Sequence, residues 1–239
     1  PSLRGVWIDG LDSYNAEWAS LNCSDNLTGS AKSNAIFKHN NFLIKSSDCN
    51  SIVIDNILDS SPNTIIGSND INPTFGGLTL ANSVNHPQGI TVYNNQFLII
   101  ADTMNNRVVF WEINDEDHLV TPGSSATKVI GQPDLLSNTL NNGGISAQSL
   151  GGPRGVAVWK NFLFVADSSN ARILRYNLNA TGADCGKAVE VFGQDSMTSQ
   201  ATGVSQSRLH LPSGIFIKSG QLFIADRNNN RILVVPLPE

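Results

Sequence analysis

FLIIADTMNNRVVFW, residues 97–111, joins two apolar runs through a short polar turn. Val, Ile, Phe and Trp favour strands, and Asn tolerates the left-handed backbone of a tight turn, so this stretch predicts a β-hairpin. Similar stretches occur at residues 163–176 and 222–235. In each copy an Asp precedes an Arg by five residues, which gives the pairs Asp102 and Arg107, Asp167 and Arg172, and Asp226 and Arg231. The chain therefore repeats its turn chemistry together with its hydrophobicity.

The hairpin belongs to a longer unit with a period of about 60 residues. Outward from the hairpin, a unit contains a Pro-x-Gly motif, a first strand, the two hairpin strands and a fourth strand that ends in Gly-Gln. Four short strands separated by turn signals predict one antiparallel sheet. The units span approximately residues 88–134, 154–195 and 213–239, and a degenerate first copy without the Asp and Arg spans approximately 34–70.

The apolar residues 3–8 precede the first unit at the spacing expected of a fourth strand. Because the last unit stops after three strands, we expect residues 3–8 to pair alongside Ile232 to Val235 and to close a ring. The prediction is an all-β fold, a single β-propeller domain over residues 1–239 with four four-stranded blades. In the alternative, the units form part of a larger or open propeller, within a longer polypeptide or an oligomer.

The composition argues against several classes of partner. The 239 residues are 40% hydrophobic, which is enough for a substantial core. The formal net charge is -5 and no Lys or Arg cluster is present, so a nucleic-acid partner is not expected. No apolar run approaches the roughly 20 residues of a membrane helix, so no membrane span is expected.

The unit resembles the NHL repeat. The resemblance rests on Pro-x-Gly followed by Ile or Val, then Ala-Asp-x-x-Asn-x-Arg, then a strand that ends in Gly-Gln. The Gly-Gln-Pro-Asp sequence at residues 131–134 is similar to the long-loop type that is common in bacterial extracytoplasmic proteins. The resemblance covers roughly residues 34–239 and implies a propeller, usually of six blades in this family. Four repeats are a departure from that pattern.

The three Asp and Arg pairs are interpreted as structural, because a feature shared by every repeat serves the repeat. We expect each pair to form a bidentate ionic contact that fixes its turn. Binding is expected on the face where these turns meet the long connections between blades, at residues 9–34, 68–86, 132–152 and 194–211. These connections are rich in Asn, Ser, Thr and Gly. The candidate binding residues on this face are Trp18, His86, Arg154 and His210.

Of the three cysteines, Cys23 lies in the connection at residues 9–34 and Cys49 in the hairpin turn of the degenerate first unit, so both are expected on this face. We therefore expect a Cys23–Cys49 disulfide to replace the missing ionic pair, which would require an oxidising compartment. Cys185 lies between the third and fourth strands of its unit and is expected to be a lone thiol.

The sequence contains no Gly-x-Ser-x-Gly, His-Glu-x-x-His or phosphate-binding loop. The function expected is therefore a non-catalytic recognition or adhesion module outside the cytoplasm, periplasmic, cell-surface or secreted, that binds a protein or glycan and needs no cofactor or metal. The family also includes a metal-dependent lyase, so a second hypothesis is that the protein is a metal-dependent lyase or hydrolase. His86 and His210, each just before a Pro-x-Gly motif, would then be ligands. A scaffold that assembles with sibling chains is a third reading.

Overall fold

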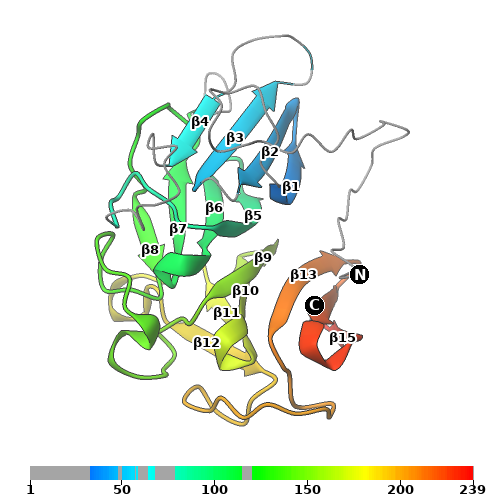
Figure 1. The fold of residues 1–239 in the computed structure, drawn as a ribbon. Helices are drawn as coiled ribbons and strands as arrows, with labels where there is room; N and C mark the ends of the chain where they lie inside the picture. The colour runs from blue at the N-terminus through cyan, green and yellow to red at the C-terminus, as the bar shows by residue number, and fades with distance from the viewer. Residues whose placement is uncertain are drawn as a thin grey trace.

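The computed structural model describes residues 33–47, 50–56, 58, 64–67, 79–114 and 120–238. They form a four-bladed β-propeller of antiparallel sheets, which confirms the predicted fold class (Figure 1). The described part contains short 3-10 turns and no α-helix. Its strands are β1 (Ser33–His39), β2 (Phe42–Ser47), β3 (Ser51–Asn56), β4 (Thr64–Gly67), β5 (Pro87–Tyr93), β6 (Phe97–Asp102), β7 (Arg107–Glu112), β8 (Lys128–Ile130), β9 (Pro153–Trp159), β10 (Phe162–Asp167), β11 (Arg172–Asn177), β12 (Ala188–Phe192), β13 (Pro212–Lys218), β14 (Gln221–Asp226) and β15 (Arg231–Pro236).

Strand order follows the chain within every sheet. Blade 1 is β1-β2-β3-β4, blade 2 is β5-β6-β7-β8, blade 3 is β9-β10-β11-β12, and blade 4 has the three described strands β13-β14-β15. Residues 3–8, expected to be the fourth strand of blade 4, lie outside the described residues. In Figure 1 the first strand of each blade faces the middle of the molecule, and β4, β8 and β12 lie on the outside.

The predicted hairpins form with Asp and Arg at their closed end. In blade 2 the register pairs Asp102 with Arg107, and a 3-10 turn over Thr103–Asn105 connects the two strands. Asn106 then adopts the left-handed conformation, with φ of 52°. Asn adopts this conformation more readily than most residues and takes the position in blades 2 and 4, whereas blade 3 has Ala171 there with φ of 52°.

The strands of blades 2 and 3 alternate between two interblade cores. In blade 2, Leu98 and Ile100 pack toward blade 1, whereas Ile99 and Ala101 pack toward blade 3. We call the side facing the following blade the forward face and the side facing the preceding blade the rear face. All four of these side chains are fully buried, because both faces of blade 2 are covered by neighbouring sheets.

Adjacent blades also meet through their first strands, in the order β1, β5, β9, β13. Between described residues, β13 makes no comparable contact with β1. The glycine of Pro-x-Gly lies at each of the contacts β5–β9 and β9–β13. A Cβ on Gly155 would lie 2.7 Å from the carbonyl oxygen of Ser213 and 3.0 Å from the nitrogen of Ile215. The motif therefore needs glycine because a neighbouring backbone occupies the place of a side chain.

A side chain from the preceding blade also bonds to the proline of the motif. The Thr103 hydroxyl donates to the Pro153 carbonyl oxygen at 2.7 Å, and the Ser168 hydroxyl donates to that of Pro212. Blade 4 has Arg227 at this position in its turn. The motif is thus fixed both by close backbone packing and by a hydrogen bond between blades.

Candidate functional site

The loop face is the end of the propeller that carries the β4–β5, β8–β9 and β12–β13 connections and the turns that follow β2, β6, β10 and β14. The topology brings these segments to one end because the first strand of each blade begins there and the fourth ends there. The buried Asp and Arg side chains of the turns lie beneath it. This face contains the described candidates for binding.

Each turn aspartate accepts hydrogen bonds on both carboxylate oxygens. Oδ1 of Asp102 accepts the Asn85 backbone N–H at 2.6 Å, and Oδ2 accepts Asn105 Nδ2 at 2.9 Å and Arg107 Nε at 2.7 Å. Asp167 has the equivalent partners Gly151, Asn170 and Arg172. One carboxylate therefore connects its turn with the connection that enters the same blade.

The arginine extends this network to a second connection. Arg107 Nη2 donates to the carbonyl oxygens of Leu80 and Ser83 at 3.0 and 2.9 Å, and Nη1 donates to that of Leu135. These acceptors belong to the connections before and after blade 2. The contact with Asp102 uses Nε, so the expected bidentate ionic pair is replaced by one ionic contact and three bonds to backbone oxygens. Arg172 repeats the arrangement with Ser146, Ser149 and Met197.

Burial affects the pKa of the turn aspartates and the cost of leaving one of their charges unpaired. The side chains of Asp102, Arg107, Asp167 and Arg172 are fully buried. Burial raises the pKa of Asp102 and Asp167, and the neighbouring guanidinium opposes that rise. A buried carboxylate without its arginine would be strongly unfavourable. In blade 4 the Arg231 side chain is 23% exposed, so that network is partly open to solvent.

A residue of the Gly-Gln motif also holds the loop face, a role that the sequence did not reveal. Gln132 Nε2 donates to the carbonyl oxygens of Asn106 and Thr139 at 3.0 and 2.9 Å. Gln194 makes the same pair of bonds, to Ala171 and Ala201. The recurrence of Gln after Gly could have indicated this role, but from sequence alone it marked only the end of a strand.

The two candidate histidines occupy different positions in their repeats. His86 precedes Pro87 directly and has φ of 48°, which matches Leu211 in blade 4. The His210 backbone N–H donates to Asp226 at 2.7 Å, as Asn85 does to Asp102. The His86 backbone N–H instead donates to Asn50 Oδ1 of blade 1 at 2.9 Å. His86 lies one residue and His210 two residues before the proline of the motif, so the two histidines are not equivalent.

Arg154 lies where two Pro-x-Gly motifs meet. Its Nη1 donates to Gln88 Oε1 at 3.0 Å, and the two residues are the variable positions of successive motifs. The half-buried Arg154 therefore belongs to the ring of first strands, whereas His86 and His210 belong to blades on either side of it. Trp18 and the proposed disulfide pair, Cys23 and Cys49, lie outside the described residues. Cys185 is an exposed free thiol in the described part.

Five large apolar side chains are exposed on the loop face. Leu80 is 44% exposed, Met104 59%, Leu136 64%, Leu140 57% and Val204 75%. The connections that carry them are rich in Asn, Ser and Thr, and the buried Arg107 donates to the carbonyl oxygens of Leu80 and of Leu135, next to Leu136. These residues were not expected from the sequence, because an apolar residue in a connection can equally well be buried in the core.

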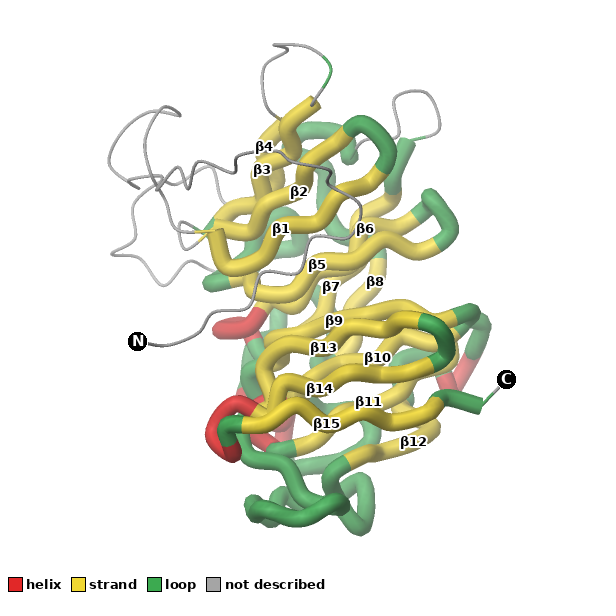
Figure 2. The backbone as a smooth tube through the Cα atoms, turned by 90° about the vertical axis from the view of Figure 1, so that its right-hand side faces the viewer, coloured by secondary structure: helices red, strands yellow, loops and turns green. Residues whose placement is uncertain are grey.

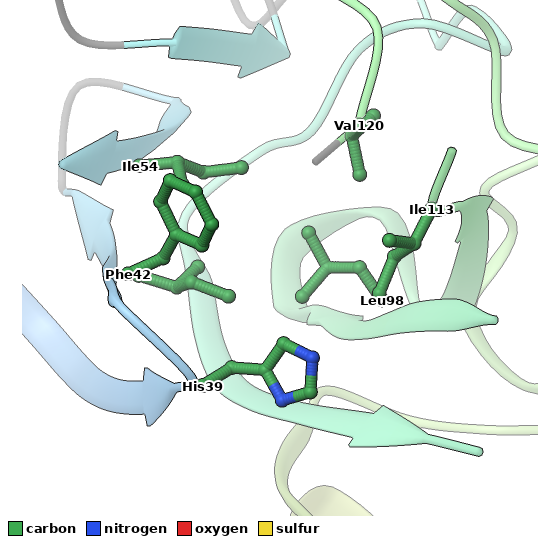
Figure 3. Close-up of a pocket in the computed structure, with 7 residues that line it drawn as sticks. His39, Phe42, Ile54, Leu98, Ile113 and Val120 are labelled. Carbon is green, nitrogen blue, oxygen red and sulfur yellow. The ribbon is translucent and has the colours of Figure 1, made fainter. Parts of the chain in front are cut away.

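Two concave regions lie away from this face. A cavity of about 10 Å³ between blades 1 and 2 is lined by His39, Phe42, Ile44, Ile54, Leu98, Ile113 and Val120 (Figure 3). It is apolar and has room for about one water molecule. A groove of about 560 Å³ at the opposite end of blade 3 is lined by polar residues that include Asn177, Asn179, Thr181, Asp184 and Lys187. Neither region contains a candidate site residue.

Within the described ranges, no three His, Cys, Asp or Glu side chains are grouped closely enough to hold a metal ion. The part of the chain that is described also has no helix of the length and hydropathy required to cross a membrane.

Comparisons with known proteins agree with the repeat and the fold. The NHL repeat family model matches residues 150–176, which contain β9, β10 and β11. Together with the four-bladed fold, this match supports the NHL β-propeller family. No curated protein matches the sequence.

Three solved structures resemble the chain. The nidogen/laminin complex has a TM-score of 0.53 at 15% identity, over 87% of this chain and 60% of that one. An auxiliary nutrient binding protein from Bacteroides thetaiotaomicron has a TM-score of 0.56 at 15% identity, over 87% of this chain and 48% of that one. The computationally designed Ika4 protein has a TM-score of 0.49 at 11% identity, over 94% of this chain and 100% of that one. The first two likenesses show the propeller fold, and this chain spans about half to three fifths of those proteins.

Proposed function

We propose that this chain is a non-catalytic recognition module of the long-loop Gly-Gln NHL type, which binds a protein ligand through its loop face. We propose a location outside the cytoplasm on the basis of the Gly-Gln-Pro-Asp sequence at residues 131–134, which resembles the long-loop type. The observation that carries the proposal is the group of exposed apolar side chains on connections held by buried arginines. Apolar anchors in a polar surround, on a backbone fixed in advance, are the usual features of a protein-binding surface.

The loop face suits a protein better than a glycan as ligand. Leu136, Leu140 and Val204 are aliphatic, and they offer no ring on which a sugar could stack. The asparagine, serine and threonine side chains around them can bond to either ligand. His86, Arg154 and His210 are proposed to contribute polar contacts from the same end of the propeller. Trp18 is retained as a fourth contact residue on the basis of its sequence position.

A binding screen tests this proposal. Wild type and a Leu136→Asp/Leu140→Asp variant are displayed against extracellular proteins and glycans, and affinities are measured for each hit. We expect a protein ligand whose affinity falls at least tenfold in the variant, because truncated interface anchors commonly cost that much. Trp18→Ala tests the proposed aromatic contact, and Arg154→Ala tests a proposed polar contact.

The control is Val189→Asp, since Val189 is 52% exposed on β12, away from the loop face. It should leave the affinity unchanged. A ligand that binds wild type and the Leu136→Asp/Leu140→Asp variant equally would contradict the proposed surface. A glycan that binds wild type and this double variant equally well would show that the ligand is a glycan and not a protein.

A further inference from the structure

The connection between β8 and β9 contains four successive residues with positive φ. Asn141 has φ of 54° and Asn142 has φ of 37°, and Gly143 and Gly144 follow with φ of 90° and 151°. This backbone is uncommon for residues other than glycine, even though Asn adopts it more readily than most. Figure 2 shows that connections between strands extend beyond the strand ends, and this one belongs to the loop face.

Hydrogen bonds fix the residues on the amino-terminal side of this run. The side-chain amides of Asn141 and Asn170 exchange two bonds, at 3.1 and 2.6 Å, which connect the run to the hairpin turn of blade 3. The Asn142 backbone N–H donates to the Thr139 carbonyl oxygen at 3.1 Å, and the Asn141 N–H donates to that of Leu150. The uncommon backbone of Asn142 is therefore imposed by its neighbours.

The open side of the run contains the only Asn-Gly pair in the chain, Asn142 and Gly143. Both residues are exposed, and a Cβ on Gly143 or Gly144 would meet nothing within 4 Å beyond its chain neighbours. Because glycine has no side chain, the Gly143 nitrogen is accessible to the carboxamide carbon of Asn142. The space around it allows the rotation about Asn142 ψ, which is 57° in the structure, that brings the two atoms together.

We propose that Asn142 is a site of spontaneous deamidation, a covalent change for which water is the co-reactant. The Gly143 backbone nitrogen attacks the side-chain carbonyl carbon of Asn142 and loses its proton, and the amide nitrogen leaves as ammonia, which forms a succinimide ring. Water then adds to one of the two ring carbonyl groups and breaks its bond to the ring nitrogen. The product is aspartate or isoaspartate, with one water consumed and one ammonia released.

Either product alters the loop face beside Leu140, which is 57% exposed. Aspartate adds a negative charge two residues away, and isoaspartate adds a carbon to the backbone next to the amide pair of Asn141 and Asn170. Both changes should lower the affinity for a protein ligand, because Leu140 is one of the proposed apolar anchors. This consequence rests on the proposed function, whereas the modification itself does not.

Peptide mapping of the folded wild type, after prolonged incubation in mildly alkaline buffer, tests the proposal. The amide at Asn142 should be lost, with aspartate and isoaspartate as two separated products of equal mass, and enzymatic methylation identifies the isoaspartate. Gly143→Ala should slow the conversion severalfold, because the methyl group hinders the attacking nitrogen. A methyl group at φ of 90° also strains the run, so the comparison is repeated in urea, where slower conversion of the variant is still expected.

Asn94 is the matched control in the same sample, because it is exposed and has φ of 51° but precedes Asn95. It should keep its amide while Asn142 loses it. Retention of the amide at Asn142, or equal conversion at the two positions, would overturn the proposal. Asn142→Asp in the binding screen tests the consequence separately. Unchanged affinity for the protein hits, together with conversion of Asn142 in the peptide map, would contradict the proposed binding surface and support the modification site.

Discussion

Replacement of Asp167 by Asn is expected to lower the free energy of unfolding by about 3–5 kcal/mol. The reason is that the fully buried Arg172 loses the ionic partner that the described structure gives it, while its guanidinium stays in place beneath the loops. The substitution also weakens the bonds from the Gly151 N–H and from Asn170. Urea denaturation, followed by circular dichroism and by tryptophan fluorescence, measures the change.

The matched control is Asp195→Asn, which removes the carboxylate of a second ion pair on the same face. Asp195 pairs with Arg208 in the connection between β12 and β13, and its side chain is 71% exposed. The bonds from Arg208 lower the pKa of Asp195, but water can solvate both groups when the pair is broken. The denaturation midpoint should therefore move little. Equal effects of the two substitutions would show that burial does not make the turn aspartate essential.

The second large effect is expected at the glycine of the blade 3 Pro-x-Gly motif. Gly155→Ala should destabilise the protein by about 3 kcal/mol, because the new Cβ would meet backbone atoms of Ser213 and Ile215. Neither atom belongs to a flexible side chain, so β13 would have to move away from β9. Thermal and urea unfolding give the measurement.

Gly214→Ala places the same change at the same position of blade 4. The added Cβ would lie 3.8 Å from Ala225 Cβ, an ordinary contact. The cost should therefore stay below about 1 kcal/mol. If Gly214→Ala were as damaging as Gly155→Ala, a further backbone would have to pack against Gly214, and the forward face of blade 4 would not be open.

The fold could be predicted from the sequence because its information is local and repeated. The apolar runs from Phe97 to Trp111 identify the hairpin, and three copies of it, each after a Pro-x-Gly motif and two of them followed by Gly-Gln, identify a blade. The reason for the glycine could not be predicted, since it depends on a backbone from the next blade. The partners of Arg107 could not be predicted either, because every residue type has a backbone carbonyl oxygen and the sequence does not show which of them accept hydrogen bonds.

The candidate site was less predictable than the fold. His86 and His210 both lie shortly before a Pro-x-Gly motif, but only His210 occupies the position whose backbone N–H donates to a turn aspartate. Leu136 and Leu140 were missed because hydrophobicity does not say whether a leucine in a connection is buried. The expected strand at residues 3–8, the contact role of Trp18 and the Cys23–Cys49 disulfide lie outside the described residues and stay predictions.

The central claim is that one buried arginine in the hairpin turn of blade 2 and one in that of blade 3 hold the connections on both sides of their blades. Amide hydrogen exchange in wild type and in Arg172→Ala tests it most directly. The account predicts that residues 139–151 and 194–201 lose protection together, while β5, β6 and β7 keep theirs, because Arg172 bonds to Ser146, Ser149 and Met197. Unchanged protection in both connections, or loss confined to the turn between β10 and β11, would contradict it.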